Sequence, residues 1–114
     1  MTVPALQDLP AQSEDDTGPY VVIVLLHARA DRADDLQARL VSQIAPTRSE
    51  PGCLDYQLVR DRIDSQRFFF YEAYADAAAF QTHLDMDYNR ALMAELPPYL
   101  DQAPDVRFGA IPPM

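Results

Sequence analysis

The chain has 114 residues, 48% of them apolar, and a formal net charge of −9, so we expect one domain built around a single hydrophobic core. The excess of 18 acidic over 9 basic side chains argues against nucleic acid and anionic membranes as partners, because both require a basic surface. With no apolar run long enough to cross a bilayer and no secretory signal, a cytoplasmic protein is expected.

The first segment, residues 1–19, is rich in Pro, Gln, Asp, Glu and Ser and shows no apolar period. This composition predicts a flexible extension, with the folded domain covering residues 20–114. The alternative is that the extension folds over the domain or over a neighbouring subunit.

A strand is expected from Tyr20 to about Arg29. Its run "VVIVLL" is rich in β-branched residues, which is typical of a strand covered on both faces. Asp31 is a candidate N-cap for the helix that follows, which should fade near Pro46 or one turn later. The apolar stripe of this helix consists of Ala33, Leu36, Leu40 and Ile44.

A second strand is expected over residues 53–61, where apolar and polar residues alternate. Leu54, Tyr56 and Leu58 should share one face, and the wetter opposite face is typical of an edge strand. The segment "DRIDSQ" is expected to be the turn into a third strand over residues 67–75, which is apolar on both faces.

Two short helices and a final strand complete the pattern. Asp76 can cap a helix through "AAAFQTHL", and a break is expected near Asp85 or Asp87. A second helical segment then ends at the "PP" pair, and "DVRF" alternates like a short strand. The apolar stripe of the second segment consists of Tyr88, Leu92 and Leu96.

The order β-α-β-β-α-β predicts an α+β, ferredoxin-like fold with a four-stranded antiparallel sheet. Right-handed crossovers place the first and third strands at the centre, and the helices cover one face. The other face would leave Phe69, Tyr71 and half of "VVIVLL" in water. Burying that apolar area favours a homodimer in which two sheets pack face to face, as in a dimeric α/β barrel.

Side-chain alternation places Glu72 on the same face of the third strand as three aromatic residues, Phe68, Phe70 and Tyr74. On the next helix, His83 shares the inward stripe with Phe80 and Leu84. If both faces point inward, they enclose a pocket with aromatic walls, one carboxyl and one imidazole, which suits a small molecule. The expected lining also includes Tyr56 and Tyr88.

Structural explanations of the same residues remain open. His83 can be a core histidine whose nitrogens bond to the backbone. Glu72 can be the partner of an arginine such as Arg60 or Arg90. The tyrosines can be ordinary core residues, and His27 is expected to face the dimer side or the rim.

Several kinds of chemistry lack support in the sequence. The chain has only three glycines and no phosphate-binding loop, and neither histidine lies in a metal-binding spacing. Cys53 is the only cysteine, so an internal disulfide and a thiolate metal cluster are excluded. We therefore expect no protein-bound metal and no nucleophilic triad.

The stretches "EPGCLDYQL" and "RFFFYEAYADAAAFQTHL" resemble the antibiotic biosynthesis monooxygenase family of dimeric α/β barrels. The resemblance spans about residues 21–108. It implies a cofactor-independent monooxygenase that oxidises a quinol or polycyclic phenol with O2, without metal or flavin. It also implies His83 or Glu72 as the base that takes the substrate proton. The ring of the substrate would be held by Tyr56, Phe70, Tyr74, Phe80 and Tyr88.

Two positions depart from the family pattern. Tyr74 stands where the family often has tryptophan, and Leu26 stands where haem-degrading relatives have asparagine. Both argue against haem degradation. The alternatives to a monooxygenase are a non-catalytic small-molecule-binding or stress-associated dimer, and a small-molecule isomerase of the same fold.

Overall fold

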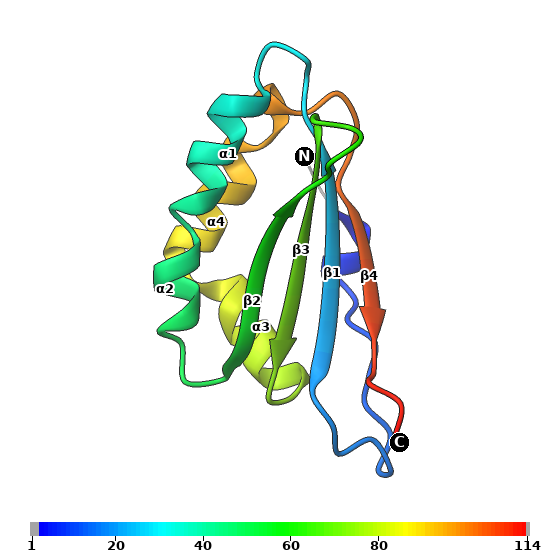
Figure 1. Ribbon diagram of the computed structural model, residues 1–114. Coiled ribbons are helices and arrows are strands. Elements are labelled where there is room, and N and C mark those ends of the chain that lie inside the picture. Colours follow the sequence, from blue (N-terminus) through cyan, green and yellow to red (C-terminus); the bar gives the residue numbers. More distant parts are fainter. Residues whose placement is uncertain (1–2, 114) are drawn as a thin grey trace.

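The computed structural model describes residues 3–113, which form a four-stranded antiparallel sheet in the order β2-β3-β1-β4 (Figure 1). Met1 and Thr2 of the predicted extension, and Met114, lie outside the described residues. The strands are β1 (Tyr20–His27), β2 (Cys53–Arg60), β3 (Arg67–Tyr74) and β4 (Asp105–Gly109). The predicted ferredoxin-like α+β fold is confirmed, with β1 and β3, the strands that carry apolar residues on both faces, at the centre of the sheet.

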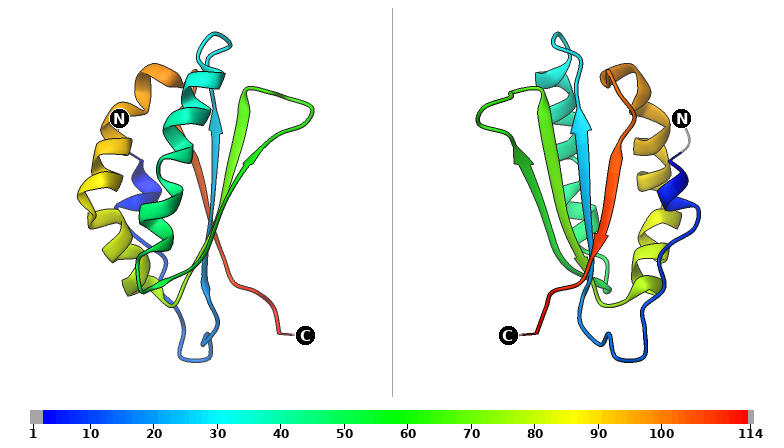
Figure 2. Two further views of the ribbon diagram at one scale, coloured as in Figure 1. Left: turned by 60° about the vertical axis from the view of Figure 1, so that its left-hand side comes forward. Right: turned by 90° about the vertical axis from the view of Figure 1, so that its right-hand side faces the viewer.

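Helices cover one face of the sheet, as Figures 1 and 2 show. They are α1 (Ala33–Val41), α2 (Ile44–Arg48), α3 (Ala77–Asp85) and α4 (Asp87–Glu95), together with the 3₁₀ turns η1 (Pro4–Leu6) and η2 (Pro97–Tyr99). None of the helices within residues 3–113 has the length and apolar character that crossing a membrane requires.

The helix starts confirm one predicted cap and contradict another. The side chain of Asp76 accepts a hydrogen bond from the backbone N–H of Ala79 at 2.8 Å, which caps α3 as expected. The predicted cap Asp31 is wrong, because α1 begins at Ala33 and Arg32 occupies the N-cap position without a side-chain hydrogen bond. Extended backbone at Met86, with ψ 136°, separates α3 from α4.

The start of β2 contains an irregularity that the alternating pattern did not reveal. The pairing register with β3 shifts between Cys53 and Asp55. Such a bulge adds one residue to β2, so the residues before it point to the opposite face of the sheet from the one that simple alternation predicts. Leu54 is therefore 58% exposed and does not share the buried face with Tyr56, which corrects the prediction.

Strand β3 alternates as predicted. Its buried side, under the helices, carries Phe68, Phe70, Glu72 and Tyr74. On the opposite side, Phe69 and Tyr71 are only half-buried, and their register partners Val59 and Ile23 are exposed. The open face of the sheet is therefore largely apolar along its middle.

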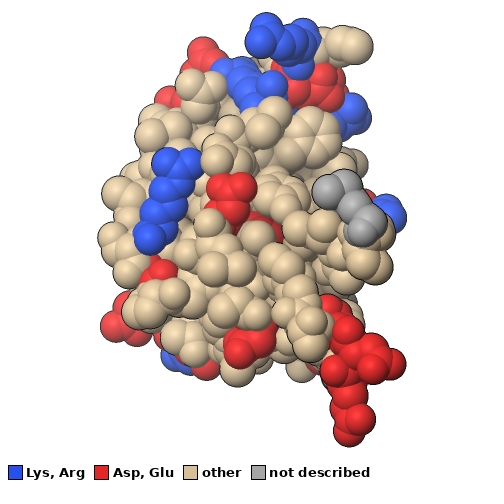
Figure 3. Space-filling view, turned by 60° about the horizontal axis from the view of Figure 1, so that its bottom comes forward, with Lys and Arg blue, Asp and Glu red and all other residues tan. Residues whose placement is uncertain are grey.

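Residues 3–19 run beside β4 and the α3–α4 layer (Figure 2). Leu6 and Leu9 pack against a buried cluster of Tyr20, Val22, Tyr74 and Phe80. The segment therefore lies over the domain in this structure, and its flexibility in solution stays a prediction. Charged groups on the end of the molecule seen in Figure 3 are mostly acidic and gather most densely at one corner.

Candidate active site

Glu72 lies in the middle of β3, opposite Val22 of β1 and Tyr56 of β2. Its side chain is buried, and the Tyr74 hydroxyl donates a hydrogen bond to its Oε1 at 2.5 Å. No arginine pairs with it among the described residues, because Arg60 bonds to Asp34 and Arg90 to Asp85. The alternative of a structural arginine partner is therefore wrong.

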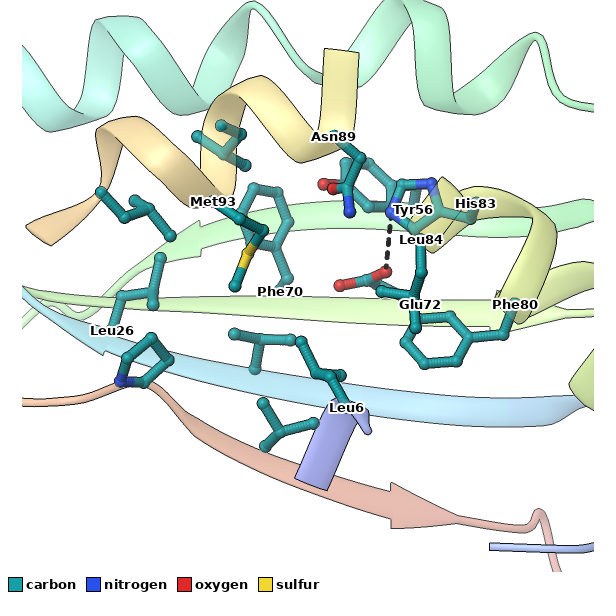
Figure 4. Close-up of a pocket in the computed structure, with 15 residues that line it drawn as sticks. Leu6, Leu26, Tyr56, Phe70, Glu72, Phe80, His83, Leu84, Asn89 and Met93 are labelled. Carbon is teal, nitrogen blue, oxygen red and sulfur yellow. Dashed lines mark ion pairs between the residues drawn. The ribbon is translucent and has the colours of Figure 1, made fainter. Parts of the chain in front are cut away.

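His83 projects from α3 toward Glu72 and is 3% exposed. Its Nδ1 lies 2.8 Å from Oε2 of Glu50. Its Nε2 lies 3.9 Å from Oε1 of Glu72, the pair that is dashed in Figure 4. The imidazole is thus held between two carboxyl groups, and the alternative of backbone-bonded ring nitrogens is wrong.

Glu50 is a site residue that sequence reasoning missed. It is 7% exposed and lies in the turn before β2, where it also accepts a hydrogen bond from the Tyr88 hydroxyl. The available signal was its position at the start of "EPGC", directly before a tight turn. Its partner, however, lies in a distant helix that no local pattern connects to it.

Close packing at Gly52 brings the turn and α3 together. A Cβ atom at Gly52 would lie 2.5 Å from the Cβ of Ala79, which is closer than two carbon atoms can approach. The backbone carbonyl of Gly52 also accepts from Ala75 N–H at 2.9 Å. Glycine therefore allows the approach that places Glu50 beside His83.

The hydrogen bonds around Glu50 assign the tautomer of His83. Oε2 of Glu50 accepts a hydrogen bond from the Tyr88 hydroxyl, so this carboxylate is the acceptor toward both Tyr88 and His83. A neutral His83 paired in this way carries its proton on Nδ1 and turns the lone pair of Nε2 toward Glu72 and the pocket.

Burial sets the electrostatics of the site. Desolvation raises the pKa of Glu72 to about 7, against the opposing effect of the Tyr74 hydrogen bond, and the nearby Glu50 charge adds to the rise. Burial also raises the pKa values of Tyr56 and Tyr74, so both hydroxyls stay protonated near neutral pH.

Glu72 and His83 open onto a narrow pocket with a cavity volume of about 50 Å³. Figure 4 shows Glu72, His83 and Asn89 near one another, whereas Leu26 and Met93 lie farther along the cavity. Asn89 is a buried polar lining residue that sequence reasoning did not identify. The remaining lining is apolar or aromatic: Leu6, Val24, Leu26, Tyr56, Phe70, Phe80, Leu84, Leu92, Met93, Leu96, Pro104 and Val106.

The structure separates the predicted ring-binding residues into two groups. Tyr56, Phe70 and Phe80 line the pocket. Tyr74 and Tyr88 are not among the lining residues, and instead their hydroxyls bond to Glu72 and Glu50. Within residues 3–113, no three His, Cys, Asp or Glu side chains are arranged to hold a metal ion.

Comparison with known proteins connects this site to a family. The sequence model described as "antibiotic biosynthesis monooxygenase" matches residues 19–95, which include Glu50, Glu72 and His83. The chain belongs to the antibiotic biosynthesis monooxygenase family. The match ends before β4 and does not include residues 3–18.

Individual proteins resemble this chain in sequence or in fold. The uncharacterized protein sll1783 of Synechocystis is 28% identical over 105 residues, covering 90% of this chain and 71% of the relative. The crystal structure of PA3566 from Pseudomonas aeruginosa matches with a TM-score of 0.81 and 26% identity, covering 86% of this chain and 98% of that one. A crystal structure described as an antibiotic biosynthesis monooxygenase matches with a TM-score of 0.78 and 26% identity, and the match covers 82% of this chain and 99% of that one.

Proposed function

We propose that this antibiotic biosynthesis monooxygenase family member oxidises a quinol or a polycyclic phenol with O2 and without a bound cofactor. The proposal depends chiefly on one observation: Glu50 holds His83 so that Nε2 faces Glu72, whose pKa is raised to about 7, inside an aromatic pocket. A base held in a fixed orientation at the polar end of an apolar cavity suits proton removal from a phenol.

The pocket favours an uncharged aromatic ligand. Tyr56, Phe70 and Phe80 provide aromatic surface on which a ring can pack. The ring hydroxyl then meets Glu72 and His83 at the polar end. Among residues 3–113, no arginine lines the pocket, so an anionic ligand would lack a counter-charge.

His83 takes the proton from the substrate hydroxyl through Nε2. The resulting imidazolium lies between the carboxylate of Glu50 and, once ionised, that of Glu72, which stabilises its charge. The substrate anion is a much stronger reductant than the neutral phenol. Removal of the proton in a largely dry pocket therefore prepares the ring for reaction with O2.

The oxidation balances without an external reductant. A quinol and one O2 give one hydroxyquinone and one water: one oxygen atom enters a new C–O bond, and the other leaves as water after the O–O bond breaks. The substrate supplies all four electrons that reduce O2. The chain therefore needs to supply only binding, orientation and the base.

The open face of the sheet supports a homodimer as the active form. Phe69 and Tyr71 are half-buried there, and Val59 and Ile23 are exposed, so a second copy stacked on this face would remove apolar area from water. Light scattering should give a solution mass of two chains at micromolar concentration. A mass equal to one chain would contradict this part of the proposal.

An oxygen electrode tests the activity. Anaerobically prepared 1,4-naphthohydroquinone and the three-ring phenol 9-phenanthrol are mixed with protein and oxygenated buffer, and spontaneous oxidation without protein is subtracted. We expect oxygen uptake that falls about 100-fold or more in His83→Ala.

Two other results would replace the proposal. Ligand binding without oxygen uptake, with any phenol tested, would indicate a binding protein. Product formation without oxygen consumption would indicate an isomerase.

A further inference from the structure

The N-terminal segment closes one side of the candidate pocket. Leu6 of η1 is a lining residue, together with Met93 of α4 and Val106 of β4. Figure 2 shows this segment running along the side of the molecule between β4 and α4. Residues 3–18 lie outside the family match, so the family model does not account for this wall.

We infer that residues 3–12 form a strap over the pocket and that Leu6 is a specificity-determining residue, which limits how large an aromatic ligand can be bound. This inference rests on the proposed function for the class of ligand, and it adds the element that selects among such ligands. The Leu6 side chain occupies the region that a larger ring system would need.

Side chains attach the strap to the domain. Leu6 and Leu9 pack on the cluster that contains Tyr20 and Phe80, and the Tyr20 hydroxyl donates to the Pro10 carbonyl at 2.8 Å. These contacts place the strap directly beside the aromatic wall of the pocket, since Phe80 belongs to both.

Gln12 connects the end of the strap to the helix that carries His83. Its Oε1 accepts from the backbone N–H of Ala77, at the start of α3, at 3.0 Å. Its Nε2 donates to the Gly18 carbonyl at 3.3 Å. The side chain thus satisfies one of the N–H groups that a helix leaves unpaired in its first turn.

The backbone of the strap is independent of the sheet. Its hydrogen bonds remain local, from Leu6 N–H to Val3 O at 2.9 Å and from Gln7 N–H to Pro4 O at 3.0 Å. Among the described residues, no ladder joins this segment to β4. The strap can therefore open without disrupting a strand, which suits an element that must move when a ligand enters.

Ligand affinity tests the inference separately from turnover. Dissociation constants of 2-naphthol and 9-phenanthrol are measured anaerobically by ligand fluorescence, so that no oxidation occurs. Leu6→Ala should shift the affinity ratio toward the three-ring phenol by about tenfold or more, and Leu6→Trp should weaken both ligands by a similar factor. Leu54→Ala and Leu54→Trp are matched controls, because Leu54 is 58% exposed and does not line the pocket.

A second variant probes the attachment without changing the lining. Gln12→Ala removes the bond to Ala77 and should raise the dissociation rate of 2-naphthol about two- to tenfold, as the loss of one hydrogen bond predicts. An unchanged affinity ratio in Leu6→Ala would overturn the inference, as would wild-type affinity for both phenols in Leu6→Trp or failure of every variant to bind either phenol. A shifted affinity ratio without oxygen consumption would support the role of Leu6 and contradict the proposed activity. Oxygen consumption with an unshifted ratio would support the activity and contradict the role of Leu6.

Discussion

The carboxylate of Glu50 lies 2.8 Å from Nδ1 of His83, although 33 residues separate the two along the chain. This contact assigns the tautomer of the imidazole and directs Nε2 toward Glu72, 3.9 Å away. Both residues are buried, so water competes little for the interaction. Glu50 therefore acts through His83, as a positioning residue.

Replacing Glu50 by Gln should lower kcat with little change in KM. The amide keeps a hydrogen-bond acceptor near Nδ1 but no longer stabilises the imidazolium that forms during proton transfer. A hydrogen bond to a charged group contributes about 1.5–3 kcal/mol, which corresponds to roughly 10- to 100-fold in rate. Tyr88→Phe is the matched control, because it removes the other donor to Glu50 and leaves His83 paired. Equal losses in the two variants would indicate a general structural effect.

The pH dependence of activity should follow Glu72. Its pKa of about 7 means that the carboxyl ionises, and begins to stabilise the imidazolium, as the pH rises through neutrality. We expect kcat/KM to increase across that range in the wild type and to lose this inflection in Glu72→Gln. Initial rates of oxygen uptake between about pH 5.5 and 8.5 give both profiles. An inflection retained in the variant would show that another group titrates.

The same carboxyl should destabilise the fold at high pH. Its folded pKa is raised from 4.5 to about 7, so the native state binds more protons than the unfolded state between these values. Stability is therefore lost as the pH rises through this window. The Glu72→Gln side chain cannot ionise. The Tm of this variant should therefore rise relative to the Tm of the wild type as the pH increases from about 5 to about 8. Thermal unfolding followed by circular dichroism measures the difference, and a constant difference would contradict the pKa shift.

His27 predicts a pH trend of the same sign from a different part of the molecule. His27 lies with Nδ1 2.8 Å from Asp101 and Nε2 2.9 Å from Asp64, and hydrogen bonds to these carboxylates, first that of Asp101, raise its pKa. The native state binds this proton more tightly, so its stabilisation is fully present below about pH 6.5 and is lost as the pH rises through the raised pKa. His27→Gln should lower the Tm more at pH 5.5 than at pH 8.5. The effect should be small and weaken in salt, since the cluster is partly exposed.

Gly52→Ala tests the contact between the turn and α3. The new Cβ would lie 2.5 Å from the Cβ of Ala79, so the backbone must move. We expect a loss of about 1–3 kcal/mol in the free energy of unfolding, as in overpacked cores, and reduced activity because Glu50 is displaced from His83. Gly109→Ala is the matched control, since nothing lies within 4 Å of a Cβ there. Denaturant unfolding that gave equal stabilities for both variants would contradict the steric argument.

The amino-acid sequence by itself determined the order of the strands and helices, and the buried faces of β3 and α3. Alternation along β3 placed Glu72 on the helix side with Phe70, and the helical spacing of Phe80 and His83 directed the imidazole inward. These patterns are local, because each residue's face follows from its neighbours in the same element.

Only the tertiary structure decided what the polar groups of the site contact. The turn at Gly52 brought Glu50 to His83, the hydroxyls of Tyr74 and Tyr88 bonded to carboxylates instead of lining the pocket, and the N-terminal strap placed Leu6 in its wall. The apolar period of a strand or helix predicts which face a residue lies on. It does not predict which distant segment that residue meets or how its hydroxyl is oriented. These contacts depend on how closely two backbones approach and which buried donor finds which acceptor, and both are properties of the packed chain.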